Sequence, residues 1–136
     1  MYRVLIPVDT NEKRALAQVD YVTALPTAAD AVEAYVLFVF TEESEAEVED
    51  HDSASEIDAV RRAEETLEDA GIDVTIVEDS GDTEADILEH AETHDVDTIV
   101  LGGRKRSPVG KALFGSISQG VLLNTDRPVV ITGSKE

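Results

Sequence analysis

Short runs of apolar, β-branched residues alternate with segments of helical periodicity along this chain. The runs expected to form strands are residues 3–8, 36–40, 72–77, 98–101 and 128–132. Residues 36–40 are apolar at every position, which is typical of a strand that is covered on both faces. Because strands separated by helices are joined through crossovers, the alternation predicts a parallel sheet with helices packed against it.

The segments between these runs carry apolar residues at the spacing of one helix face. The predicted helices cover residues 12–25, 57–70, 82–94 and 116–123. Pro26 closes the first of them, because proline cannot continue a helix. Ser53 and Glu56 have the spacing of a capping box in front of the second.

The expected fold class is α/β, in a single domain that covers residues 1–136. We predict a three-layer sandwich, in which a five-stranded, mostly parallel sheet has about four helices distributed over both faces. Ligands of such sheets bind beyond the carboxyl ends of the strands. This chain places Asp9, Val39 or Phe40, and Gly102 at such ends.

The composition is strongly acidic, with 30 Asp and Glu against 11 Lys and Arg and a net charge of −19. This charge argues against nucleic acids and anionic membrane surfaces as partners. Disorder is excluded because 42% of the residues are hydrophobic and fall in periodic runs. Such an acidic coat is typical of a protein adapted to molar salt, as in a halophile, with an ordinary acidic protein as the alternative.

Residues 41–52 are almost free of apolar residues and are expected to form an acidic mobile loop, which either covers the site or is merely solvated. The chain has no Cys, so disulfides and thiolate chemistry are excluded. No signal peptide or transmembrane segment is recognisable, and the expected location is the cytoplasm.

Residues 102–116 combine glycines with a local excess of basic residues. Within this stretch lie Arg104, Lys105, Arg106 and Lys111, four of the chain's 11 basic residues. An anionic ligand such as a phosphate explains this grouping, because glycines let backbone N–H groups approach an oxyanion and Ser116 stands where a helix can begin. The alternative is that the basic residues pair with surface acids.

Three stretches of the chain resemble the universal stress protein family: Val4-Leu5-Ile6-Pro7-Val8-Asp9, the strand at 37–39, and the block from 101–116 to Arg127-Pro128-Val129-Val130. The family motif is Gly, two residues, Gly, nine residues, then Gly and Ser or Thr. Gly102, Gly115 and Ser116 match it at the right spacing, while Lys105 stands at the second glycine. The resemblance implies the adenine nucleotide alpha hydrolase-like fold and, in many members, ATP binding.

The resemblance also implies roles for individual residues. Pro7, Asp9 and Val39 would face the adenine and ribose of ATP or AMP, with Mg²⁺ accompanying ATP. Gly102, Gly115, Ser116 and Ile117 would line the phosphates. Lys105 either fills the phosphate site or contributes its ammonium group to it, with Arg104 beside it.

Two functions therefore stay open, a nucleotide-binding stress-response sensor and a dimeric interaction module that binds no nucleotide. A homodimer is expected in both, through the last strand from Pro128 to Thr132, because an unpaired sheet edge invites pairing with its copy. A small nucleotidyl-transfer enzyme is a third interpretation, but it lacks a catalytic motif. No general base is identifiable, so any ATP hydrolysis is expected to be slow.

Other motifs give weaker signals. Asp9 is explained equally well as a helix N-cap, a role that can coexist with ligand binding. His90 and His94 have metal-ligand spacing on a helix, but solvent-exposed histidines on a polar face are the favoured interpretation. Ser116 lacks the context of a nucleophile, and neither a Walker A motif nor a dinucleotide-binding fingerprint is present.

Overall fold

The computed structural model describes residues 1–41, 53–103 and 115–133. In this part of the chain five strands form one sheet: β1 (Tyr2–Val8), β2 (Val32–Phe40), β3 (Asp73–Ser80), β4 (Thr98–Gly102) and β5 (Val129–Thr132). Their order is β3-β2-β1-β4-β5, and every pair of neighbours is parallel. The predicted parallel sheet is confirmed, and β5 lies at its edge as expected.

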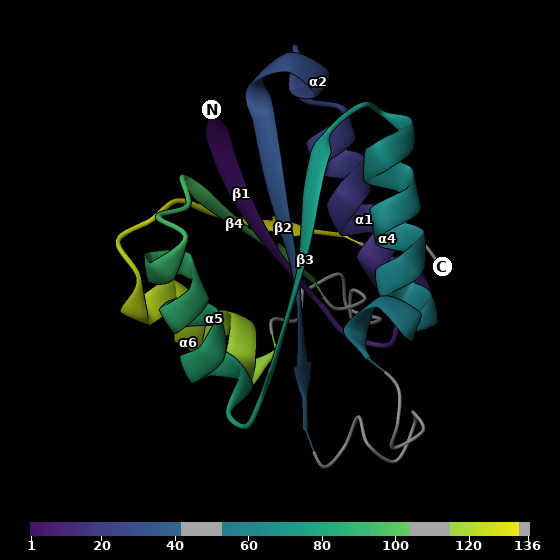
Figure 1. The fold of residues 1–136 in the computed structure, drawn as a ribbon. Coiled ribbons are helices and arrows are strands. Elements are labelled where there is room, and N and C mark those ends of the chain that lie inside the picture. The colour runs from purple at the N-terminus through teal and green to yellow at the C-terminus, as the bar shows by residue number, and fades with distance from the viewer. Residues whose placement is uncertain (42–52, 104–114, 134–136) are drawn as a thin grey trace, which may run out of the picture.

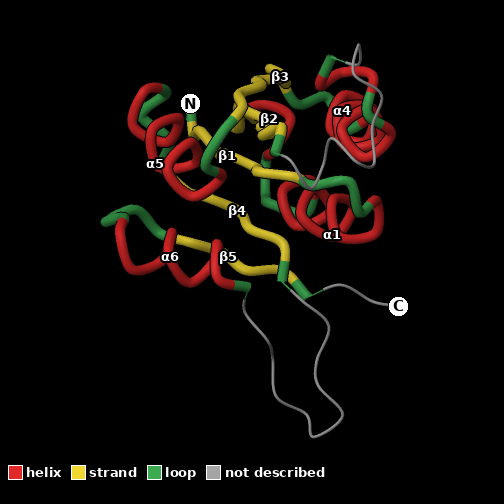
Figure 2. Tube along the Cα trace, turned by 90° about the horizontal axis from the view of Figure 1, so that it is seen from below, coloured by secondary structure: helices red, strands yellow, loops and turns green. Residues whose placement is uncertain are grey.

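Four longer helices cover the sheet: α1 (Glu12–Thr23), α4 (Asp58–Asp69), α5 (Thr83–Thr93) and α6 (Ser116–Asn124). Figure 1 shows α1 and α4 together on one side of the sheet and α5 and α6 together on the other. The view along the layers in Figure 2 shows the same division. The three-layer α/β sandwich predicted from the sequence is therefore confirmed.

Each helix layer closes its own hydrophobic core against the central strand β1. Val4 and Ile6 belong to the core under α1 and α4, whereas Leu5 belongs to the core under α5 and α6. All three residues are fully buried. The strand alternates its side chains between the two faces, and both faces are covered, which explains why its sequence is apolar without interruption.

Some element boundaries differ from the sequence predictions. The capping box at Ser53 is wrong, because Ser53 precedes the short 3₁₀ helix η1 (Ala54–Glu56), its side chain makes no capping hydrogen bond, and α4 begins only after Ile57. Ala54 is fully buried, so packing of this turn displaces the helix start. The first helix ends at Thr23, since Pro26 disfavours helical backbone in the residue before it.

Two further differences concern connections and edges. The short helix α2 (Ala28–Ala31), which the sequence pattern did not indicate, joins α1 to β2. The strand predicted over residues 72–77 spans Asp73–Ser80 and alternates exposed with half-buried residues, as is typical of an edge strand. The acidic stretch expected to be a mobile loop falls, from residue 42 to residue 52, outside the described residues.

The order of the strands fixes where a ligand can bind. From β1 the chain turns through α1 to β2 on one side of the sheet, and from β3 it returns through α5 to β4 on the other side. The carboxyl ends of β1 and β4 are therefore neighbours whose connections leave in opposite directions, which opens a crevice between them. None of the helices in the described ranges combines the length and apolar character needed to cross a membrane.

Candidate functional site

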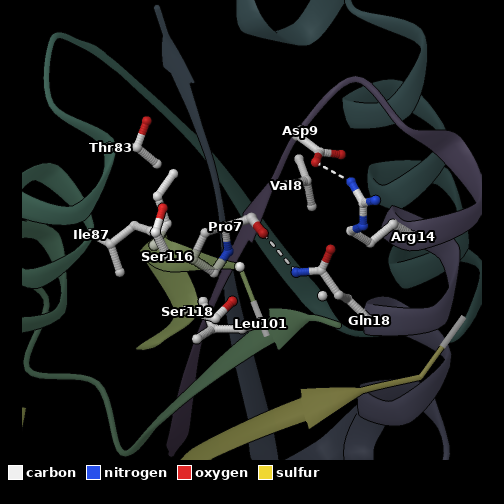
Figure 3. A pocket seen from close by; sticks show the side chains of 13 residues that line it. Pro7, Val8, Asp9, Arg14, Gln18, Thr83, Ile87, Leu101, Ser116 and Ser118 are labelled. Atoms are coloured by element: carbon white, nitrogen blue, oxygen red, sulfur yellow. Dashed lines mark hydrogen bonds and ion pairs between the residues drawn. The ribbon is translucent and has the colours of Figure 1, made fainter. Parts of the chain in front are cut away.

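A cavity of about 160 Å³ opens at the carboxyl ends of β1 and β4 (Figure 3). Its described lining comprises Pro7, Val8, Asp9, Arg14, Gln18, Thr83, Ile87, Leu101, Gly102, Gly115, Ser116, Ile117 and Ser118. The lining comes from the ends of β1 and β4 and from the first two turns of α1, α5 and α6. Segments far apart in the sequence thus meet where the topology predicts a ligand.

Six of the residues singled out from the sequence line this cavity: Pro7, Asp9, Gly102, Gly115, Ser116 and Ile117. Val39 does not line it, because it lies near the end of the neighbouring strand β2, where it is 8% exposed and packs in the core under α5 and α6. Arg104 and Lys105 lie outside the described residues.

The floor of the cavity is a buried polar bridge that Gln18 makes from α1. The β1–β4 ladder pairs Val4 with Thr98 and Leu5 with Ile99, and Pro7 has no N–H group with which to extend it. The Gln18 amide nitrogen donates to the carbonyl of Pro7 at 2.6 Å and to the carbonyl of Val100 at 2.9 Å. Gln18 is 1% exposed, so it replaces lost ladder hydrogen bonds where water has little access.

Asp9 and Arg14 form an ion pair on one wall of the cavity. One carboxylate oxygen of Asp9 accepts from the backbone N–H of Asn11 at 2.9 Å, and the other accepts from the Arg14 guanidinium. The residue that caps α1 is Asn11, whose side chain accepts from the Arg14 N–H at 2.9 Å. The interpretation of Asp9 as the N-cap is therefore wrong. Asp9 instead orders the turn before the helix by accepting from the N-cap residue Asn11.

Gly102 lets Arg14 lie flat against the end of β4. A Cβ atom at this position would stand 2.3 Å from Cγ of Arg14 and 2.6 Å from its Cδ. The next residue, Gly103, donates its backbone N–H to the carbonyl of Thr132 at 2.7 Å. Gly102 at the end of β4 thus allows close packing of Arg14, and Gly103 after it allows close packing of β5.

The opposite wall contains the start of α6. Gly115 is the N-cap, and Ser116 and Ile117 follow in the first turn, with Thr83 and Ile87 of α5 beside them (Figure 3). The first backbone N–H groups of a helix have no partner within the helix and carry partial positive charge. This wall is therefore suited to an anionic or polar group of a ligand.

Several lining residues were missed from the sequence, notably Arg14, Gln18, Thr83 and Ser118. Gln18 could have been identified from the sequence, because it falls on the apolar face of its helix beside Ala15, Val19 and Val22. A polar residue on a buried face must satisfy its hydrogen bonds elsewhere. Arg14 gave no such signal, because on an acidic surface it resembles any solvated basic residue.

His90 in α5 and His94 at its C-cap are in a different environment from the one predicted. His90 has a side chain only 16% exposed, and its Nε2 lies 2.9 Å from a carboxylate oxygen of Asp79. His94 stacks on Tyr35, with ring centroids 4.4 Å apart, and also on His90 at 5.6 Å. The expectation of exposed histidines on a polar face is wrong, because α5 packs this side against β2 and β3.

The contacts around these histidines shift the pKa values of Asp79 and His94. The hydrogen bond from His90 lowers the pKa of Asp79 below its usual range, aided by the backbone N–H of Ser80. Burial lowers the pKa of His94, and the nearby His90 and Arg3 add to the effect. Within the described ranges no group of three or more His, Cys, Asp or Glu side chains is arranged to hold a metal ion.

Comparison with known proteins identifies the family. The model of the universal stress protein family matches residues 1–133. A universal stress protein of Mycolicibacterium smegmatis is 36% identical over 72 residues, which are 52% of this chain and 55% of that protein. The chain spans about half the length of the curated relatives it matches.

Solved structures share the fold of this chain. The hypothetical protein MJ0577 is similar with a TM-score of 0.78 and 25% identity, over 99% of this chain and 97% of that chain. The universal stress protein of Archaeoglobus fulgidus in complex with dAMP has a TM-score of 0.70 and 19% identity, over 97% of this chain and 98% of that chain. With its sandwich fold and its family match over residues 1–133, the chain belongs to the universal stress protein family.

Proposed function

We propose that this universal stress protein binds an adenine nucleotide, AMP or ATP, in the cavity at the carboxyl ends of β1 and β4. In this proposal it acts as a stress-response sensor and not as an enzyme. One observation supports it above all: Asp9, Gly102 and the Gly115–Ser116 pair, distant in sequence, border one cavity at the switch point of the sheet.

The chemistry of the two walls fits the parts of a nucleotide. The first turn of α6 offers backbone N–H groups to phosphate oxygens, and the absence of a side chain at Gly115 keeps the approach open. Asp9 already accepts from Asn11 and Arg14, but a carboxylate has about four lone-pair positions and can also accept from a ribose hydroxyl.

The size of the cavity suggests how the ligand extends. Its volume of about 160 Å³ among the described residues is smaller than the roughly 300–1,000 Å³ of typical ligand pockets. We propose that it takes the ribose and first phosphate, and that the base reaches toward the end of β2, where Val39 lies. The complex of the Archaeoglobus fulgidus protein with dAMP supports a monophosphate by analogy of fold.

If ATP is the ligand, Mg²⁺ accompanies its phosphates, and Asp9 is the carboxylate of the described lining that can approach the ion. Asp9 is committed to Arg14, so it is a poor general base for an attacking water. Any hydrolysis of ATP is therefore expected to be slow.

A homodimer is the second part of the proposal, and the position of β5 favours it. Pro128 and Thr132 direct their carbonyls to β4, where Ile99 and Gly103 donate to them. Because neighbouring residues of a strand alternate, Val129 and Ile131 direct their N–H and C=O groups to the open edge. Exposed Leu122 and Leu123 on α6 add apolar surface for a partner copy.

We further propose that the protein works in a cytoplasm of molar salt, as in a halophile. The net charge of −19 supports this idea, because such charge opposes folding in dilute buffer and is screened over about 3 Å at roughly 1 M salt.

Isothermal titration with ATP, AMP and cyclic AMP in roughly 2 M KCl tests the function, the salt being chosen to screen the acidic coat. Binding should be lost in Gly115→Trp, which fills the cavity wall, and kept in Gly133→Trp, where a Cβ has no described atom within 4 Å. Lys105→Gly restores the family motif. If wild type gives no heat but Lys105→Gly binds, the lysine blocks the site and the protein is a dimeric interaction module.

A further inference from the structure

Arg14 is the cation of the described cavity lining. Asp9 is the other charged side chain in this lining, so the pair is neutral until a ligand arrives. The basic residues that the sequence suggested for this role lie between residues 104 and 114, outside the described ranges. A chain with a net charge of −19 repels anions, so a local positive charge such as this guanidinium is needed to attract one into the cavity.

The guanidinium is held in place from three directions. Its residue lies in the first turn of α1, where Asn11 accepts from its backbone N–H. Its stem packs on the bare backbone of Gly102, so that 26% of the side chain is exposed. Its Nη1 donates to Asp9. A side chain restrained in this way loses little entropy when it binds a ligand.

The guanidinium has a buried donor without a partner. The Nε atom of Arg14 is buried and has no hydrogen-bond partner among the described residues. Buried N–H groups without a partner are costly, and arginine presents its donors as a planar fork suited to phosphate oxygens. Figure 3 places Arg14 and Asp9 on one side of the cavity and Ser116 with Thr83 on the other.

On this geometry we propose that Arg14, which is paired with Asp9, binds the phosphate group of the nucleotide. The inference rests on the proposed function and adds a specificity to it. The phosphate is held between the Arg14 fork and the first turn of α6, so the site selects a nucleoside phosphate over the nucleoside itself.

Titration of AMP and adenosine against matched variants tests this assignment. Arg14→Gln removes the charge, and Arg14→Lys keeps the charge but loses the planar fork. Arg61→Gln is the control, because this substitution removes the same charge away from the cavity. Arg61 is a half-exposed residue of α4 that pairs with Asp58. Circular dichroism and thermal melting establish that each variant is folded.

We expect Arg14→Gln to weaken AMP binding by about tenfold or more and adenosine binding by less than about twofold. Arg14→Lys should give an intermediate loss for AMP, and Arg61→Gln should match wild type. Equal losses for AMP and adenosine, or an unchanged AMP affinity in Arg14→Gln, would overturn the role of Arg14 while leaving nucleotide binding intact. A wild type that binds neither ligand would instead overturn the proposed function, and the assignment of Arg14 with it.

Discussion

The side-chain amide of Gln18 donates a 2.6 Å hydrogen bond to the backbone carbonyl of Pro7. Its second bond, to the carbonyl of Val100, joins the ends of the two central strands through a residue of a helix. The crevice in which we place the nucleotide is therefore open because the ladder stops, and it is stable because Gln18 satisfies the carbonyls below it.

Substituting Gln18→Met should test this bridge. Methionine has a similar length but cannot donate a hydrogen bond, so two carbonyls lose their partner. The free energy of unfolding should therefore fall by about 1–3 kcal/mol. Urea denaturation measures the change. Gln119→Met, at an exposed position of α6, is the control and should stay within about 0.5 kcal/mol of wild type. An equal effect at both positions would mean that the bridge contributes nothing specific.

Gly103 should not tolerate a side chain. A Cβ there would stand 2.6 Å from the backbone carbonyl oxygen of Thr132, so Gly103→Ala must move β5 and should cost about 1–3 kcal/mol. Gly133→Ala provides the comparison, since no described atom lies within 4 Å of its Cβ position. Urea denaturation of both variants checks the prediction, which fails if the two are equally stable.

The dependence of stability on pH should include a contribution from His94. Its pKa is lowered in the fold, so the folded protein resists a proton that the unfolded chain accepts. The stability that this group contributes is thus present above its unfolded pKa of about 6.5 and lost as the pH falls below that value. His94→Gln should therefore lose less unfolding free energy than wild type between about pH 7.5 and about pH 5.5. Identical losses in urea titrations at the two pH values would contradict this account.

Salt should stabilise the protein by screening specific acidic neighbours. Burial raises the pKa of Glu64, and the charges of Glu68 and Glu65 on the same helix raise it further. Glu68→Gln removes one repulsive pair at helical spacing, so it should raise the melting temperature in about 0.1 M KCl and have a smaller effect in about 2 M KCl. Wild type should melt at least about 5 °C higher in the concentrated salt. A flat melting temperature would argue for an ordinary acidic protein.

The open edge of β5 should be responsible for the proposed dimer. Val129→Pro removes an N–H group that faces away from β4, and it should yield a folded monomer in analytical ultracentrifugation. Val129→Thr keeps the N–H group and the branched side chain, and should remain dimeric. A folded Val129→Pro protein that still sediments as a dimer would place the interface elsewhere.

Local sequence patterns predicted the layers of the fold and the region of the site. Apolar runs such as Val4-Leu5-Ile6, which are buried on both faces, are typical of a parallel sheet. The spacing of Gly102, Gly115 and Ser116 marked the strand end and helix start that border the cavity. These features depend on local pattern, which can be read along the chain.

Which polar side chains meet in the cavity depends on tertiary packing and could not be predicted from these patterns. Arg14 and Gln18 reach the cavity because α1 packs across the ends of β1 and β4, and Val39 is kept away from the lining by its burial in the core. His90 and His94 are half-buried because α5 turns them toward Asp79 and Tyr35 on other strands. Such contacts join residues far apart in the sequence, and their partners are fixed by packing of the whole fold, which no local pattern encodes.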